Sequence, residues 1–208
     1  MKARATYVLT QLLVLLLSVS LVFAQETVSM PQQDAPTQSR TFTQQELDQM
    51  LAPIALYPDS LLSQILMAST YPLEVVEAAR WSRANPNLKG DEAVRAVEQN
   101  TWDPSVKSLV AFPQILQMMD EKLGWTERLG DAFLSQQALV MDTVQNLRQK
   151  AYAAGNLKST DQVRVEQQGQ TIVIEPTRPE VIYVPYYDPL VVYGPWWWPA
   201  YPPVYWAP

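Results

Sequence analysis

The sequence "YPDSLLSQILMASTYPLEVVEAAR", residues 57–80, determines much of the fold, because it contains two helix starts of the same form. Pro58 and Pro72 each follow a tyrosine, and proline is favoured at the first position of a helix, where a backbone N–H has no partner to lose. The two prolines are fourteen positions apart, which is too short for a solenoid repeat, so the segment predicts two successive helices. One face of the first helix carries Leu61, Leu62, Ile65 and Leu66.

An earlier helix start lies at "FTQQEL", residues 42–47. Thr43 and Glu46 have the spacing of a capping box, in which the threonine hydroxyl accepts from the Glu46 N–H and the carboxylate accepts from the Thr43 N–H. Phe42 and Leu47 stand where a hydrophobic staple would place two apolar side chains. We therefore expect ordered structure to begin at residue 42.

Proline and turn residues divide residues 42–155 into a helical domain of short helices and one long helix. After residue 72 we expect helices over 72–84, 91–99, from Asp103-Pro104 to before Pro113, over 113–123 with Gly124 as its end, and over 126–153 with Gly155 as its end. The predicted core consists of Phe42, Leu47, Leu61, Leu62, Ile65, Val76, Leu109, Ile115, Phe133, Val140, Val144 and Leu147.

The hydrophobic period changes from helical to alternating after the long helix. Residues 163–165 and 172–174 alternate apolar and polar side chains around a turn at 167–170, which predicts a β-hairpin. "EVIYVPYY", residues 180–187, predicts a third strand that Pro185 ends or confines to an edge. The predicted fold class is therefore α+β: a mainly helical domain, a small antiparallel sheet within residues 156–188, and an irregular aromatic and proline-rich tail over 189–208.

The N-terminus has the pattern of a signal peptide. Residues 1–24 contain two basic residues, a mostly apolar stretch and an alanine at the expected cleavage site, so we expect a mature chain that starts at Gln25. An uncleaved segment that holds the protein at a membrane is the alternative, because the apolar stretch is just short of the ~20 residues that span a bilayer. Residues 25–41 are rich in Gln, Thr, Ser and Pro and predict a disordered linker.

Two stretches of the chain resemble a bacterial family known as domain of unknown function 3300. They are "LAPIALYPDSLLSQILMASTYPLEVVEAARW" (residues 51–81) and "VIYVPYYDPLVVYGPWWWPAYPPVYW" (residues 181–206), and the resemblance extends over residues 42–206. It implies an exported protein of the Gram-negative periplasm or cell envelope, sometimes membrane-associated, with no assigned activity. Neither stretch matches a catalytic motif.

Composition excludes several chemistries. The chain has no histidine and no cysteine, which removes Ser-His-Asp and Cys-His nucleophiles, thiolate and imidazole metal sites, and disulfides. Glu74 and Glu77, one helical turn apart, form the best carboxylate pair, and they suggest a carboxylate-dependent hydrolase acting on cell-wall glycan as one alternative. The simpler interpretation is that both stabilise a helix N-terminus, with Arg80 as a surface partner, and that Asp59 does the same in its helix.

The tail predicts contacts rather than catalysis. Its aromatic side chains could cover the helical domain, bind an envelope protein or glycan, or make peripheral contact with a membrane. Asp188 lies among these aromatics, although Asp-Pro is also a common turn. We expect a non-catalytic exported protein without cofactor or metal, and the net charge of −6 argues against nucleic acid as a partner. The candidate contact surface comprises Tyr186, Tyr187, Asp188, Tyr193, Trp196, Trp197, Trp198, Tyr201, Tyr205 and Trp206.

Overall fold

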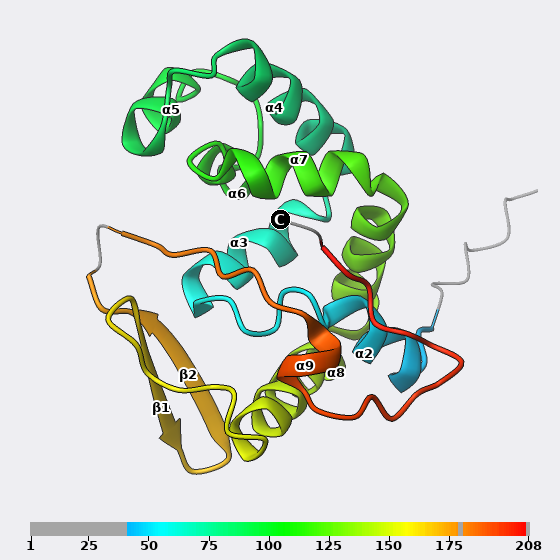
Figure 1. Cartoon of the computed structure of the whole chain (residues 1–208). Coiled ribbons are helices and arrows are strands. Elements are labelled where there is room, and N and C mark those ends of the chain that lie inside the picture. Colours follow the sequence, from blue (N-terminus) through cyan, green and yellow to red (C-terminus); the bar gives the residue numbers. More distant parts are fainter. Residues whose placement is uncertain (1–40, 179–180, 207–208) are drawn as a thin grey trace, which may run out of the picture. The chain divides into compact units, whose positions relative to one another are not determined.

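The computed structural model describes residues 41–178 and 181–206, which belong to one unit, Ser39–Pro208. The signal peptide and nearly all of the linker predicted for residues 1–41 lie outside the described residues. Within them the chain forms eight helices and a two-stranded antiparallel sheet, so the predicted α+β class is confirmed (Figure 1).

The elements follow the chain in the order helices, hairpin, short helix. The helices are α2 (Gln44–Leu51), α3 (Asp59–Ala68), α4 (Pro72–Ala84), α5 (Gly90–Ala96), α6 (Pro104–Leu109), α7 (Pro113–Glu121), α8 (Leu123–Ala153) and α9 (Pro189–Val192). The strands are β1 (Val163–Gln168) and β2 (Thr171–Pro176).

Most helix starts follow the local sequence signals. The Thr43 capping box is complete, since its hydroxyl accepts from Glu46 and the Glu46 carboxylate accepts from Thr43. Pro72 occupies the first turn of α4, and the Asp103 side chain caps α6 by accepting from the Ser105 N–H at 2.8 Å. Pro58 differs from the expectation: its ψ of 143° is extended, so it precedes α3 and the helix begins at Asp59.

The long helix α8 starts earlier than the sequence suggests and contains a kink. Gly124 was expected to end the preceding helix, but the break falls at Lys122, and Gly124 lies in the first turn of α8. At Gln136 the backbone leaves the helical region, with φ −141° and ψ 41°. The Gln136 side-chain amide there accepts from the Phe42 N–H at 2.6 Å and donates to its carbonyl at 3.1 Å. Gly155 ends the helix with a φ of 74°, as predicted.

The helices enclose one apolar core. Of the side chains predicted for it, all are buried except Val76 and Phe133, which are half-buried. On α4 the buried face is one residue away, at Val75. Among the described residues no helix combines the length and the apolar composition needed to cross a bilayer.

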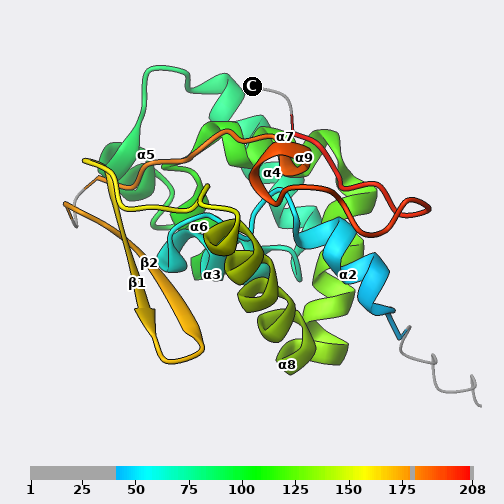
Figure 2. The ribbon, with the colours of Figure 1, turned by 60° about the horizontal axis from the view of Figure 1, so that its bottom comes forward.

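The hairpin packs one face of β2 against the helices. Val165 pairs with Ile174, and Gly169 supplies a positive φ of 64° in the turn. Ile172 and Ile174 are buried beside α3 and α8, and the hairpin lies on one side of α8 with α2 on the other (Figure 2). The expected third strand is wrong for residues 181–187, because no other strand lies beside them in the described chain.

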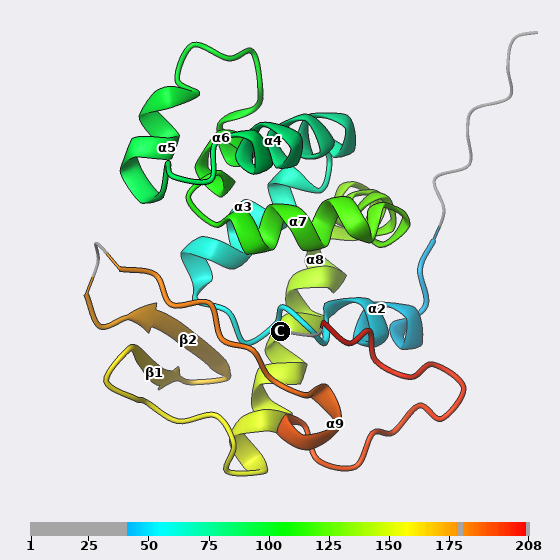
Figure 3. The same ribbon diagram turned by 45° about the horizontal axis from the view of Figure 1, so that its top comes forward.

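Residues 181–206, called the C-terminal segment below, cover the helical domain from outside. Figures 1 and 3 show this segment, orange to red, passing α8 and then running around α2. Two hydrogen bonds attach its end to α2: Val204 donates to the Gln49 carbonyl, and the Gln49 side chain donates to Pro202.

Candidate functional site

The predicted contact surface divides into side chains that face the protein and side chains that face solvent. Tyr193 and Trp206 are buried, while Tyr187 and Trp196–Trp198 are half-buried. Tyr186, Tyr201 and Tyr205 are exposed, as is Asp188. None of the four tryptophans is exposed, which is the arrangement expected if the tail covers the helical domain.

Two tyrosine hydroxyls fix the C-terminal segment to one carbonyl. Tyr187 and Tyr193 both donate to the carbonyl oxygen of Ala52, at 2.9 and 2.7 Å, in the loop between α2 and α3. The Tyr187 hydroxyl also accepts from the Leu56 N–H at 3.3 Å. Burial raises the pKa of both hydroxyls well above its ordinary value, and it does the same for the pKa of Tyr57, whose ring meets Tyr187 edge to face.

Trp206 closes the core at the end of the described chain. Its ring centroid lies 4.7 Å from that of Trp125 and 6.3 Å from that of Tyr57. Trp125 donates its indole N–H to the Met50 carbonyl at 3.0 Å, whereas the buried indole N–H of Trp206 has no partner among the described residues. Aromatic pairs in tilted and edge-on arrangements stabilise a core beyond the area they bury.

Asp48 on α2 holds two consecutive tryptophans. Its Oδ2 accepts from the indole N–H of Trp197 at 2.8 Å and of Trp198 at 2.7 Å. Lys150 on α8 places its ammonium group 4.0 Å from the centroid of the Trp197 ring, a cation–π geometry. Neither Asp48 nor Lys150 was predicted from the sequence to contact the tryptophans. For Asp48 the available signal was a carboxylate next to the apolar Leu47 on an amphipathic helix.

The remaining candidates shape the turns of the segment. Asp188 accepts from the Leu190 N–H at 2.8 Å and caps α9, so it has the turn role that Asp-Pro suggests. The indole N–H of Trp196 donates to the Tyr201 carbonyl at 2.8 Å, which closes the loop that contains the three tryptophans.

Arg148 on α8 is a further residue that the sequence analysis missed. Its guanidinium is buried and donates to the carbonyls of Ala55, Tyr57 and Ile172 at 2.7, 3.0 and 2.9 Å, and to Asp59. It thus joins the α2–α3 loop to β2. The position of Arg148 in the sequence could have indicated its burial. It lies four residues after Val144 and three before Ala151, which places it on the apolar face of the helix.

The two carboxylates considered for acid–base catalysis bind a neighbouring loop. Glu74 accepts from the Asp103 N–H at 2.6 Å, and Glu77 accepts from the indole N–H of Trp102 at 2.9 Å. The pair therefore connects α4 to the start of α6. No group of three or more Asp or Glu side chains that could hold a metal ion occurs in the part of the chain that the structure describes.

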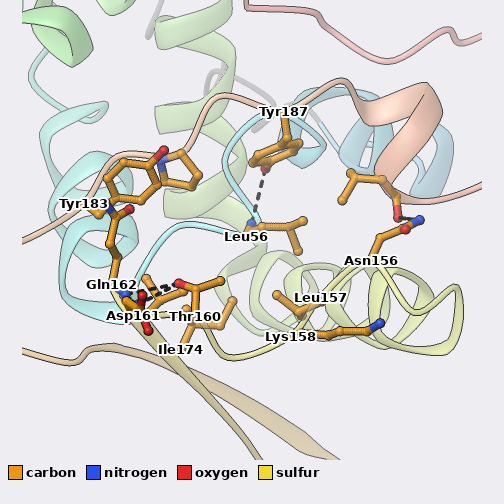
Figure 4. A pocket seen from close by; sticks show the side chains of 13 residues that line it. Leu56, Asn156, Leu157, Lys158, Thr160, Asp161, Gln162, Ile174, Tyr183 and Tyr187 are labelled. Atoms are coloured by element: carbon orange, nitrogen blue, oxygen red, sulfur yellow. Dashed lines mark hydrogen bonds between the residues drawn. The ribbon is translucent and has the colours of Figure 1, made fainter.

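A cavity of about 430 Å³ lies between the C-terminal segment and the chain that joins α8 to β1. In Figure 4 Tyr183 and Tyr187 lie on one side of it, Leu157 and Lys158 on the other, with Leu56 between them. Its lining is mostly apolar, and its polar groups come from the connection that precedes β1. This volume falls in the range of about 300–1,000 Å³ that ligand pockets occupy.

Fold and site together define a small α+β protein in which an aromatic C-terminal segment closes a helical domain. The chain belongs to the family described as a protein of unknown function (DUF3300), whose family model matches residues 43–208. It is similar to the uncharacterized protein YacH of Escherichia coli (strain K12), with 44% identity over 214 residues, 88% of this chain and 35% of the relative. The chain thus spans about a third of the length of that relative. No solved structure matches it.

Proposed function

We propose that this protein is exported and acts in the cell envelope as a non-catalytic binding protein, whose C-terminal segment contacts another envelope component. The observation that carries the proposal is the division of the aromatic side chains of this segment. Inward rings such as Tyr193 and Trp206 attach the segment, while Tyr183, Tyr186 and Tyr205 are 43–51% exposed.

The exposed apolar side chains are concentrated in this segment. Seven of the thirteen large apolar side chains that are exposed in the described residues come from residues 181–206. Exposed apolar surface is costly for a monomer and commonly marks a contact site. Tyrosine is also enriched at interfaces, because it combines a large ring with a hydroxyl that can form hydrogen bonds.

Export is supported by the sequence of residues 1–24, and the absence of histidine and cysteine supports a role without nucleophilic catalysis. The segment is a binding surface of fixed shape, because its inward rings hold it on the helical domain. A partner then meets pre-ordered tyrosines and does not have to order them itself.

The test uses the full chain with a C-terminal affinity tag, expressed in a Gram-negative host. Osmotic shock should release a mature form that begins at Gln25, and crosslinked capture should recover an envelope component. The double variant Tyr186→Ser/Tyr205→Ser should lose that component, while Tyr152→Ser, which removes a 45% exposed tyrosine on α8, should retain it. Retention by both variants, or recovery of Met1 in the cytoplasmic fraction, would contradict the proposal.

A further inference from the structure

Residues 181–184 have the side-chain pattern of a β-strand but no strand beside them. Val181 and Tyr183 are exposed, whereas Val184 is buried, and Ile182 between them is half-buried. Valine, isoleucine and tyrosine are residues that strands favour. Among the described residues, the main chain of Ile182–Tyr187 makes no hydrogen bond to any other group.

Unpaired main-chain groups at this position are unfavourable. Val184 is a buried residue, 8% exposed, and its peptide N–H and carbonyl have no hydrogen-bond partner among the described residues. Buried peptide groups are almost always paired, because losing water without gaining a partner costs about as much free energy as a lost hydrogen bond. The segment therefore has the properties of a strand edge that a ligand could complete.

A groove runs along this unpaired segment. The 430 Å³ cavity borders Tyr183, and a smaller one of about 50 Å³ borders Val181 and Tyr183. Both cavities are lined by Gln162 and Tyr183, so they adjoin one another along the C-terminal segment, and the two together are called the groove below. Figure 4 shows the side chains that line the larger cavity, with Tyr183 and Leu157 among them.

We propose that this groove binds an extended peptide segment of a partner protein, which pairs as a β-strand with Ile182–Val184 and inserts an aliphatic side chain into the larger cavity. Strand addition of this kind takes its affinity from main-chain hydrogen bonds and its specificity from pockets for alternate side chains. Pro185 has no N–H and so limits the pairing to the residues before it. The proposal rests on the proposed function, since it names what the C-terminal segment binds.

The sequence argues for a different protein as the source of the peptide. Residues 25–40, "QETVSMPQQDAPTQSR", have few of the aliphatic residues that a paired strand needs. The aliphatic side chains of β2, Ile172 and Ile174, are buried in the chain's own core and unavailable to a second copy. Because the chain has a net charge of −6, a partner segment with basic residues beside the paired part is favoured.

The experiment follows amide exchange in the full chain, labelled with ¹⁵N, on addition of the probe acetyl-Lys-Thr-Val-Thr-Val-Thr-Lys-amide. The exchange of the amides of Ile182–Val184 should slow at least tenfold at saturation. A control peptide with proline in place of the second valine cannot pair and should have no effect. Val192→Phe, which fills the cavity, should weaken probe binding at least tenfold, whereas the neighbouring Val191→Phe, 67% exposed and outside the cavity lining, should leave it unchanged.

Unchanged exchange at these amides, or equal binding of both peptides, would overturn the proposal. The amides of Ile182–Val184 could also exchange more slowly at higher protein concentration without any peptide. That result would mean that a second copy of the chain occupies the groove, and it would overturn the proposal as well. The capture experiment on the exposed tyrosines is independent of this assay. If only the peptide experiment fails, the proposed peptide-binding groove is wrong. If only the capture experiment fails, the proposed role in the cell envelope is wrong.

Discussion

Arg148 on α8 donates to the carboxylate of Asp59, the first residue of α3, although the arginine side chain is only 1% exposed. The two partners are unequal, since 43% of the Asp59 side chain remains exposed to solvent. The carboxylate thus keeps part of its hydration while it neutralises a buried charge. This reduces the desolvation cost that makes fully buried ion pairs expensive.

Replacing Arg148 with alanine should lower the free energy of unfolding by about 3–5 kcal/mol, the range found when one partner of a buried pair is removed. The loss also leaves the carbonyls of Ala55, Tyr57 and Ile172 without their donor. Urea unfolding followed by circular dichroism measures the change. Arg80→Ala, at an exposed position of α4, should stay within about 0.5 kcal/mol of the parent. Equal losses of stability at both positions would contradict the structural role of the buried Arg148 guanidinium.

Two glycines of α8 should respond to alanine in opposite directions. A Cβ at Gly130 would lie 2.2 Å from the Ser69 carbonyl oxygen, so α8 would have to move away from the end of α3. Gly130→Ala should therefore destabilise by about 1–3 kcal/mol or more. Gly124→Ala meets nothing within 4 Å and should stabilise by about 0.5 kcal/mol, because alanine favours the helix. Thermal unfolding of both variants is the measurement, and a gain at both positions would refute the close approach.

Asp48→Asn should loosen the tryptophans of the C-terminal segment. The native carboxylate accepts from Trp197 and Trp198 on one oxygen and from Gln44 on the other. An amide in either orientation turns its own N–H groups toward one of these donors. We expect a loss of about 1–3 kcal/mol in stability and stronger quenching of tryptophan fluorescence by acrylamide. Asp142→Asn, at an exposed position of α8, is the matched control and should change neither quantity.

Three inward-facing tyrosines predict unfolding by alkali. Burial raises the pKa of Tyr57, Tyr187 and Tyr193 above the ordinary value of 10.0. Below pH 10 these tyrosines are protonated in both states and stability is at its full value. As the pH rises above 10 the unfolded chain loses protons that the folded chain keeps, so stability falls by about 1.4 kcal/mol per pH unit for each such tyrosine. Urea unfolding between pH 8 and 11 measures the slope, which Tyr187→Phe should reduce by about one such contribution.

Local sequence signals predicted the local features of this fold. The Thr43 capping box, Pro72 in the first turn of α4 and the stop at Gly155 depend on residues within a few positions of each other. The kink at Gln136 could not be predicted in this way. Its side-chain amide pairs with the main chain of Phe42, 94 residues earlier, so the cause lies outside any local window.

The sequence predicted the location of the candidate site from its composition, but not which of its side chains are buried. Its residues were identified because aromatics and prolines are concentrated there, but their burial depends on partners in the helical domain. Tyr187 faces inward because Ala52 offers a carbonyl, while its neighbour Tyr186 is exposed. The prediction of a third strand was wrong for a related reason. Side-chain alternation at 181–184 indicates an extended backbone, but strand pairing requires a second strand, which the described chain does not provide.

The hydrogen bonds that attach the C-terminal segment join residues far apart in the sequence, and this has a consequence for the order of folding. Tyr187 reaches Ala52 across 135 positions, and Trp198 reaches Asp48 across 150. Contacts of such separation are slow to form, because a long loop must close before any free energy is gained. The helices can assemble from nearer contacts before the C-terminal segment docks. Without the C-terminal segment, Tyr57 and Trp125 would lose their contact with Trp206. A variant that lacks residues 181–206 should therefore be removed by proteases.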